Sequence, residues 1–260
     1  MMVKSQTISC DVLIIGAGLA GLSAALEAQK HGVSIVMLAK GRIGRSGNTP
    51  ISRGGMAAVL ADGYDGDSVS LHIEDTLRGG ACLSDRKLVS VLAENADREI
   101  GRLAESGVPF LKKNNRIVRL GSPGHSRKRF LNMDASYAGL RGPDGLAITK
   151  PLLQKVSASG IILLEGVMVI GLLGDGHRVA GAYGLDRREE KAWLFNSSTV
   201  ILASGGLGRL YRVTSNAVDA TGDGYAQAGQ VGADLRDMEF IQFHPAMTLV
   251  RDHFVWHWNA

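Results

Sequence analysis

The first forty residues change from a buried-strand pattern to a helical pattern and back. Residues 12–15 are a continuous apolar run, typical of a central parallel strand that is buried on both faces. The glycine-rich turn 16–21 follows, and a helical pattern then runs to about residue 31. Its small residues recur at steps of four, three and four, which lets a helix pack closely on a sheet: Ala17, Gly21, Ala24 and Ala28. Gly32 ends the helix and residues 33–38 predict a second strand, so this region is a βαβ unit.

The remaining periodicity predicts more strands and helices. Residues 41–66 are rich in glycine and predict a loop region that faces a ligand, whereas 114–147 are irregular. An amphipathic helix is expected over 85–106, with Leu88, Val91, Leu92, Asn95, Ile100 and Leu103 mostly on one face. Shorter helices are expected over 148–159 and 221–231, and strands over 161–164, 167–173, 179–185, 192–203 and 239–243. The pattern indicates an α/β fold: a Rossmann-like domain with a central parallel sheet, helices and an additional β-sheet.

Composition narrows the class of protein. The 260 residues, 45% of them hydrophobic, suit one large domain or one domain and part of a second. The net charge of +4 comes from dispersed basic residues, so no nucleic-acid partner is expected. Cys10 and Cys82 lack CxxC spacing, which indicates a reducing compartment and no metal site. The first residues lack the basic, apolar, small-residue order of a secretory signal, so none is expected, and the longest apolar stretch, 160–174, is too short to span a bilayer. We expect a cytoplasmic chain without membrane insertion.

The turn after the first strand carries the clearest chemical signal. Its glycines allow a tight turn and close approach of the backbone to a pyrophosphate, and the helix N-terminus is an anion site. Set between a buried strand and a small-faced helix, the turn predicts a dinucleotide site. The alternative is that these glycines only pack the helix on the sheet. The end of the second strand holds Ala39 and Lys40 where an acidic residue usually binds ribose, which weakens a plain NAD-dehydrogenase interpretation.

Four longer blocks make a family resemblance specific. Residues 11–28, 46–59, 201–224 and 237–245, with a weaker block at 72–85, resemble the fumarate reductase and succinate dehydrogenase flavoprotein family, which also includes L-aspartate oxidase. The resemblance implies FAD bound in an extended pose and hydride transfer between flavin N5 and a C4 dicarboxylate. It also implies a small dicarboxylate substrate and, in many members, an iron–sulfur electron-transfer subunit as partner. The two cysteines of this chain form no cluster that could hold such a centre.

The resemblance assigns cofactor contacts residue by residue. The pyrophosphate turn corresponds to Gly16, Ala17, Gly18, Leu19, Ala20 and Gly21, followed by Ala39 and Lys40 at the second strand end. The loop beside the flavin ring corresponds to 46–55, with Ser46, Gly47, Asn48, Thr49, Gly54 and Gly55. Some family members carry a histidine covalently joined to the flavin at the position of Asn48; asparagine has no nucleophilic ring nitrogen, so non-covalent FAD is expected. Further contacts are implied for Val167 (adenine end), Ala203, Ser204, Gly205 and Asp223.

Each of these assignments has a plainer alternative. Ser46, Asn48 and Thr49 alone would indicate a polar turn, and residues 203–206 an ordinary strand-end turn. Asp223 stands where a carboxylate is commonly a helix N-cap, a role compatible with a cofactor contact.

Three residues are candidates for substrate contacts. His244 ends the expected strand 239–243, with Phe240, Gln242 and His244 on one face. The resemblance implies that His244 binds a substrate carboxylate near the flavin, where an imidazolium would stabilise developing charge. His125 and Arg129 resemble a substrate-side or domain-contact segment of aspartate oxidases; the alternative for them is a solvated basic loop.

The family pattern stops near residue 245. We expect 1–245 to be the first segment of the FAD-binding domain and 246–260 to be a divergent tail at the start of a capping domain that is largely absent. A truncated or frame-altered chain, or a fragment, with little dicarboxylate activity by itself is therefore expected. Three functions stay open: a succinate/fumarate-type oxidoreductase, an L-aspartate oxidase, and a non-catalytic FAD-binding module.

Overall fold

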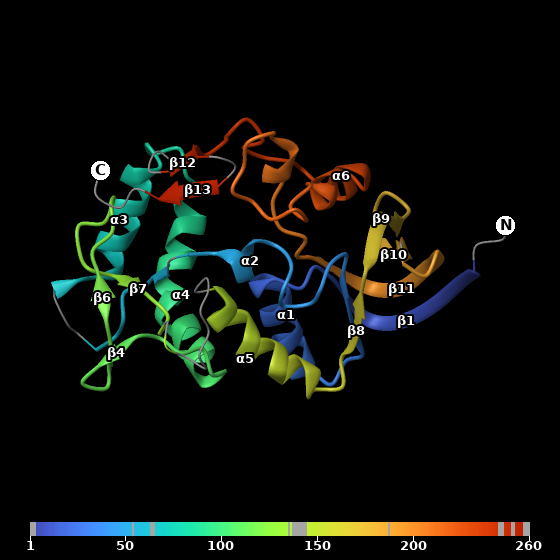
Figure 1. Ribbon diagram of the computed structural model, residues 1–260, viewed down its shortest axis with the longest axis horizontal. Helices are drawn as coiled ribbons and strands as arrows, with labels where there is room; N and C mark the ends of the chain where they lie inside the picture. The colour runs from blue at the N-terminus through green and yellow to red at the C-terminus, as the bar shows by residue number, and fades with distance from the viewer. Residues whose placement is uncertain are drawn as a thin grey trace.

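A six-stranded sheet organises the molecule (Figure 1). The computed structural model describes residues 4–53, 55–62, 66–134, 136, 145–186, 188–243, 247–250 and 253–256. The first four strands of the sheet order run parallel and the last three form an antiparallel meander that shares β11 with them. Their order is β8 (Ile162–Glu165), β2 (Ile35–Ala39), β1 (Lys4–Ile15), β11 (Lys191–Leu202), β10 (Val179–Asp186) and β9 (Val167–Gly174). The expected βαβ unit and the strands between 161 and 203 are confirmed.

Alternate residues of the parallel strands face two separate cores. Ile14 of β1 and Met37 of β2 are fully buried against α1 (Leu19–Gln29) and α5 (Gly145–Ser157), which lie side by side in Figure 1. Their neighbours Leu13 and Val36 face the other way and pack against residues of the meander, among them Phe195. Because both faces of these strands are covered, β1 and β2 end in uninterrupted apolar runs rather than alternating ones.

Two helices at the far end from the meander carry the middle of the chain (Figure 1). In α3 (Val69–Gly79) the N-cap Ser68 accepts a hydrogen bond from the Leu71 amide at 3.2 Å, and in α4 (Arg86–Glu105) the N-cap is Asp85. α4 confirms the helix expected over 85–106, but α3 has no counterpart in the periodicity analysis.

The face of α4 that the periodicity favours is only partly buried. Leu88, Val91 and Leu92 are between 51% and 64% exposed, whereas Val89 and Ile100 are buried. The interpretation of the apolar positions as one core-facing stripe is therefore wrong for the first half of α4. In that half Val89 and Ala93 are buried on one side of the helix, whereas no described residue covers the side that carries Leu88, Val91 and Leu92.

Short elements complete the description. A small three-stranded sheet joins β3 (Met56–Ala57), β7 (Phe130–Leu131) and β6 (Arg119–Leu120), so the expected additional sheet is present. The other elements are α2 (Asn48–Ile51), β4 (Lys112–Lys113), β5 (Arg116–Ile117), η3 (Gly208–Leu210), α6 (Asp223–Gln230), β12 (Met247–Val250) and β13 (His253–Trp256).

The expected strand over 239–243 is wrong. Residues 237–239 form a turn in which Phe240 N–H donates to the Asp237 carbonyl at 3.1 Å, and 240–243 have no regular structure. Phe240 is 59% and Phe243 82% exposed. A strand needs a neighbouring strand to pair its backbone groups, and these residues have none in the described part of the chain.

No helix among the described residues has the length and apolarity that a membrane span requires. The boundary expected at residues 245 and 246 falls where the structure describes neither residue, and it stays a prediction.

Candidate cofactor site

A cleft of about 370 Å³ lies at the carboxyl ends of the parallel strands β1, β2 and β11. The residues that end or follow these strands line it: Ile15 and Gly16, Leu38 and Ala39, Leu202 and Ala203. β1 lies between β2, the next strand along the chain, and β11, which comes much later, so the direction of the strand order reverses at β1. Open α/β sheets bind ligands outside the carboxyl ends of their strands at such a reversal. The cleft is therefore where the strand topology places a ligand.

The glycines of the turn 16–21 bring three backbones together. Gly16 has φ +110°, and a Cβ on it would lie 2.2 Å from the Ala203 carbonyl oxygen. Gly21 is the third residue of α1, where a Cβ would lie 2.0 Å from the Gly16 oxygen. Larger residues at these two positions would push β11 and α1 away from the turn. Gly18 is the N-cap of α1 and makes no side-chain cap hydrogen bond.

The loop 46–49 is held in place by its own polar side chains. Ser46 Oγ accepts a hydrogen bond from Arg42 N at 2.6 Å, which closes the turn that precedes the loop. Thr49 Oγ1 accepts from Leu19 N at 3.1 Å and so occupies one of the free N–H groups at the start of α1. Asn48 hydrogen-bonds Asn216 and Ala217 across the cleft. Ser46 lies in a bend, whereas Asn48 and Thr49 begin the short helix α2, so the polar turn that the sequence alone suggests is wrong for Asn48 and Thr49. The hydroxyls of Ser46 and Thr49 each accept a hydrogen bond from a backbone N–H.

Lys40 and Asp223 meet at one end of the cleft. Lys40 Nζ lies 2.6 Å from Asp223 Oδ2 and also donates to Thr221 Oγ1, although 183 residues separate Lys40 from Asp223. Burial alone would raise the pKa of Asp223, but hydrogen bonds from Lys40 and Thr221 outweigh it and hold that pKa below its usual range. The N-cap of α6 is Gly222, so Asp223 is not the N-cap that its position suggests. Both partners are ionised, and the β2 end of the cleft carries a cation and a carboxylate together.

The structure adds cleft residues that the sequence analysis did not name. Gln227 is buried one helical turn after Asp223, and its Nε2 donates to the Val169 carbonyl at 2.8 Å. The spacing of four from Asp223 is a signal that could have found Gln227. The other added residues are Ile15, Leu38, Gly41, Arg42, Val169, Leu202, Asp219 and Ala220, and Gly206 of the expected turn 203–206 also lines the cleft.

The structure brings most of the expected cofactor contacts to this one cleft. Lining it are Gly16, Ala17, Gly18, Leu19, Ala20, Ala39, Lys40, Ser46, Gly47, Asn48, Thr49, Val167, Ala203, Ser204, Gly205 and Asp223. Gly21 and Gly55 are not in the lining; a Cβ on Gly55 would lie 1.8 Å from the Leu131 oxygen, so Gly55 packs β3 against β7. Gly54 and His244 lie outside the described residues, and their roles stay predictions.

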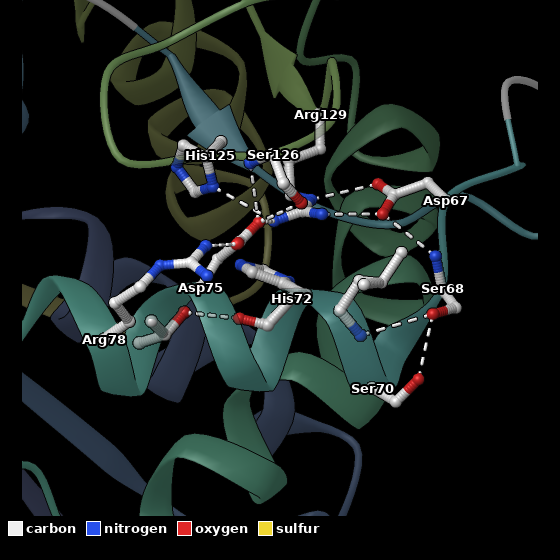
Figure 2. Close-up of polar contacts among 11 residues, drawn as sticks. Asp67, Ser68, Ser70, His72, Asp75, Arg78, His125, Ser126 and Arg129 are labelled. Carbon is white, nitrogen blue, oxygen red and sulfur yellow. Dashed lines mark hydrogen bonds and ion pairs between the residues drawn. The ribbon is translucent and has the colours of Figure 1, made fainter. Parts of the chain in front are cut away.

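Arg129 and His125 lie in a separate buried network (Figure 2), and neither lines the cleft. The Arg129 guanidinium, 0% exposed, holds Asp67 through two hydrogen bonds of 2.9 and 2.6 Å and Asp75 through one of 2.6 Å. His125 Nδ1 lies 3.2 Å from Arg129 Nη1. The interpretation of this segment as a solvated basic loop is wrong for Arg129, because its charge is paired with two buried carboxylates.

The network fixes the ionisation of its members. Burial would raise the pKa of Asp75, but hydrogen bonds from Ser126 and Arg129 hold it well below its usual range. Arg129 likewise outweighs burial at Asp67, so the pKa of Asp67 is lowered too. Burial first, and then the charge of Arg129, lower the pKa of His72, whose Nδ1 has no hydrogen-bond partner among the residues that the structure describes. Two carboxylates therefore stay ionised around one guanidinium.

The network also supports the loop beside the cleft. The Arg129 carbonyl accepts from Ala58 N at 3.0 Å, and Leu131 in β7 pairs with Met56 in β3. β3 continues directly from the glycine pair at the end of the 46–55 loop. Arg129 thus anchors the strand on which that loop ends, and a substrate contact for Arg129 stays a prediction.

The cleft suits FAD by its own chemistry. Small residues line the turn at the helix N-terminus, where a pyrophosphate needs backbone N–H groups, and side chains at 16, 21 or 41 would fill the space or displace its walls. No group of three or more His, Cys, Asp or Glu side chains suitable for a metal ion occurs among the residues that the structure describes.

Comparison with known proteins agrees with FAD as the cofactor. The family model described as FAD binding domain matches residues 11–255. One subunit of the fumarate reductase (CoM/CoB) of Methanothermobacter marburgensis is 37% identical over 242 residues, which cover 93% of this chain and 43% of that protein. L-aspartate oxidase of Streptomyces coelicolor is 33% identical over 246 residues, which cover 92% of this chain and 40% of that protein. The chain therefore spans about two fifths of the curated relatives it matches.

Solved structures share the fold at similar identity. The Mycobacterium smegmatis Sdh1 complex superposes with a TM-score of 0.85 at 31% identity, over 94% of this chain and 42% of the matched one. A point variant of E. coli quinol fumarate reductase superposes with a TM-score of 0.82 at 31% identity, over 93% of this chain and 40% of the matched one. This chain belongs to the family of FAD-binding flavoproteins that includes fumarate reductase, succinate dehydrogenase and L-aspartate oxidase.

Proposed function

We propose that FAD lies along the cleft, with its pyrophosphate at the turn 16–21, its flavin towards the loop 46–55 and its adenosine towards Val167. The observation that carries this proposal is the convergence of three distant segments on one cleft at the carboxyl ends of β1, β2 and β11. The free N–H groups at the start of α1 would bind the phosphate oxygens. Lys40 would neutralise phosphate charge, and Asp223, held by Lys40, would accept hydrogen bonds from hydroxyl groups of the cofactor.

The FAD is proposed to be non-covalent. Asn48 offers no nucleophilic nitrogen, and both ends of its amide are engaged with Asn216 and Ala217. Acid precipitation of the holoprotein should release all the flavin to the supernatant. Flavin absorbance that stays with the washed precipitate would contradict this.

The reaction is proposed to be succinate/fumarate-type oxidoreduction of a C4 dicarboxylate. When bound, FAD supplies hydride chemistry at flavin N5. His244 is the chain's candidate for binding a substrate carboxylate, where an imidazolium would stabilise negative charge that develops on the substrate. Fumarate reductase and succinate dehydrogenase relatives support this substrate class, and an iron–sulfur subunit is proposed as the electron partner.

L-aspartate oxidation is the second candidate, because several relatives at 33–37% identity carry that name. Two assays separate the candidates: fumarate with a reduced dye, and L-aspartate with oxygen. Fumarate-dependent dye oxidation is the expected result. Hydrogen peroxide formed with aspartate alone would favour the oxidase, and inactivity in both with FAD bound would favour a non-catalytic FAD-binding module.

A further inference from the structure

One side chain joins the two walls of the cleft. Asn48 Nδ2 donates to Asn216 Oδ1 at 2.6 Å, and Ala217 N donates to Asn48 Oδ1 at 2.8 Å. Both partners lie in one segment, 168 and 169 residues after Asn48 in the sequence. We call this pair of hydrogen bonds the Asn48 latch.

Both ends of the latch are anchored. On the near wall, the next residue, Thr49, accepts from Leu19 N at the start of α1. On the far wall, Asn216 Nδ2 donates to Thr214 Oγ1 at 3.1 Å, and the Asn216 amide packs on Gly208 so closely that a Cβ there would lie 2.3 Å from Nδ2. The latch therefore links two segments that are each held by further contacts.

Each wall continues into the lining of the cleft. The near wall contributes the residues from Ser46 to Thr49, and the far wall runs on from Ala217 to Asp219, Ala220 and Asp223. Asn48 itself is exposed, so the latch adds little to the packing of either core. The latch instead sets the distance between the two walls, and so the fit of the cleft around a bound ligand.

Asparagine is the side chain that fits both contacts. Its amide donates to the Asn216 oxygen and accepts from the Ala217 N–H at the same time, which an aspartate, lacking a donor, cannot do.

We propose that Asn48 is a positioning residue that holds the cleft closed on bound FAD and slows its release, acting through Asn216 and Ala217. This inference rests on the proposed placement of FAD in the cleft. It predicts that side chains outside the phosphate turn control how long the cofactor stays bound.

The test measures FAD association and dissociation rates by flavin fluorescence in the chain and in three variants. Asn48→Ala removes both hydrogen bonds and should raise the dissociation rate about tenfold, with a smaller change in the association rate. Asn216→Ala removes one bond and should raise it about threefold. The double variant should match Asn48→Ala, because Asn216 has no latch partner left to lose.

Asn196→Ala is the matched control, because Asn196 is an exposed asparagine on β11 that does not line the cleft. Its FAD dissociation rate should equal that of the unmodified chain, and the unfolding midpoint of the apoprotein should be unchanged in all variants. Wild-type rates in Asn48→Ala would overturn the latch. A double variant in which the effects of the two single substitutions on the FAD dissociation rate add would also overturn it. So would a wild-type dissociation rate in Asn216→Ala together with fast release from Asn48→Ala, since Asn48 would then act on the flavin directly. Failure of the unmodified chain to bind FAD would instead overturn the placement of the cofactor.

Discussion

Gly16 is a position at which the surrounding backbone leaves no room for a side chain. Its φ of +110° disfavours any side chain, and the Ala203 oxygen occupies the place of a Cβ. A methyl group added at Gly16 would therefore disturb the ends of β1 and β11 and the phosphate turn at the same time.

Gly16→Ala should lower FAD affinity by more than tenfold and destabilise the chain by roughly 2 kcal/mol or more, because strain and overlap add. Flavin fluorescence titration and urea unfolding measure the two effects. Gly101→Ala is the control: Gly101 is an exposed position of α4 with nothing within 4 Å of its Cβ, so it should gain about 0.5–1 kcal/mol and bind FAD normally. Normal FAD binding by Gly16→Ala would contradict the assignment of the turn.

Lys40→Met tests the charge at the β2 end of the cleft. The substitution keeps much of the side-chain volume and removes the ammonium, so Asp223 would face the cofactor phosphates unpaired. FAD affinity should fall about tenfold and depend less on salt. Titrations at low and high ionic strength check this; equal affinity for both chains at low salt would show that Lys40 does not contact the cofactor.

At the scale of elements, the Arg129 network ties α3 to β7. Asp75 comes from α3, Asp67 from the residues before it, and Arg129 from the residue that precedes β7 (Figure 2). Removing one partner of a buried ion pair leaves the other charges uncompensated, which costs more than the pair contributes.

Arg129→Ala should therefore lower the free energy of unfolding by about 3–5 kcal/mol. Arg129→Lys keeps the charge and loses the two-point contact with Asp67, so an intermediate loss is expected. Arg127→Ala, at an exposed neighbouring arginine, should change stability by no more than about 0.5 kcal/mol. Denaturant unfolding gives all three values, and a loss at Arg129 no larger than at Arg127 would show that the network is not structural.

The same network makes the fold sensitive to acid. The pKa values of Asp67 and Asp75 are lowered in the folded chain, so the unfolded chain binds more protons once the pH falls towards the usual carboxylate range. Stability from these groups is complete at neutral pH and is lost as the pH falls below about 4. Asp75→Asn should reduce the slope of unfolding free energy against pH in that range by up to about 1.4 kcal/mol per pH unit. An unchanged slope would mean that Asp75 titrates alike in both states.

At the scale of the molecule, the cleft exists only when distant segments are folded together. Its walls come from the turn after β1, the loop after β2, the start of β9 and the segment from β11 to α6. A ligand that spans it binds the folded state alone and should raise the unfolding temperature by mass action.

FAD at a hundredfold excess over its dissociation constant should add about 2.7 kcal/mol of stability. FMN should add less at equal concentration, because it lacks the adenosine part that would reach Val167, whereas ADP should still stabilise the chain. Thermal unfolding with each ligand makes the comparison. Equal stabilisation by FMN and FAD would contradict the proposed extended placement.

The sequence by itself determined the βαβ unit, the meander strands, the dinucleotide turn and the family. These features are local: the apolar runs, glycine positions and small-residue spacing sit within short windows, where backbone sterics and periodicity decide the outcome. Tertiary structure decided which distant groups meet. It paired Lys40 with Asp223, Asn48 with Asn216, and Arg129 with two carboxylates, and it left Leu88 and Phe243 exposed where an apolar pattern favours burial. Hydrogen bonds and burial depend on partners brought together by the whole chain, and periodicity carries no information about those partners.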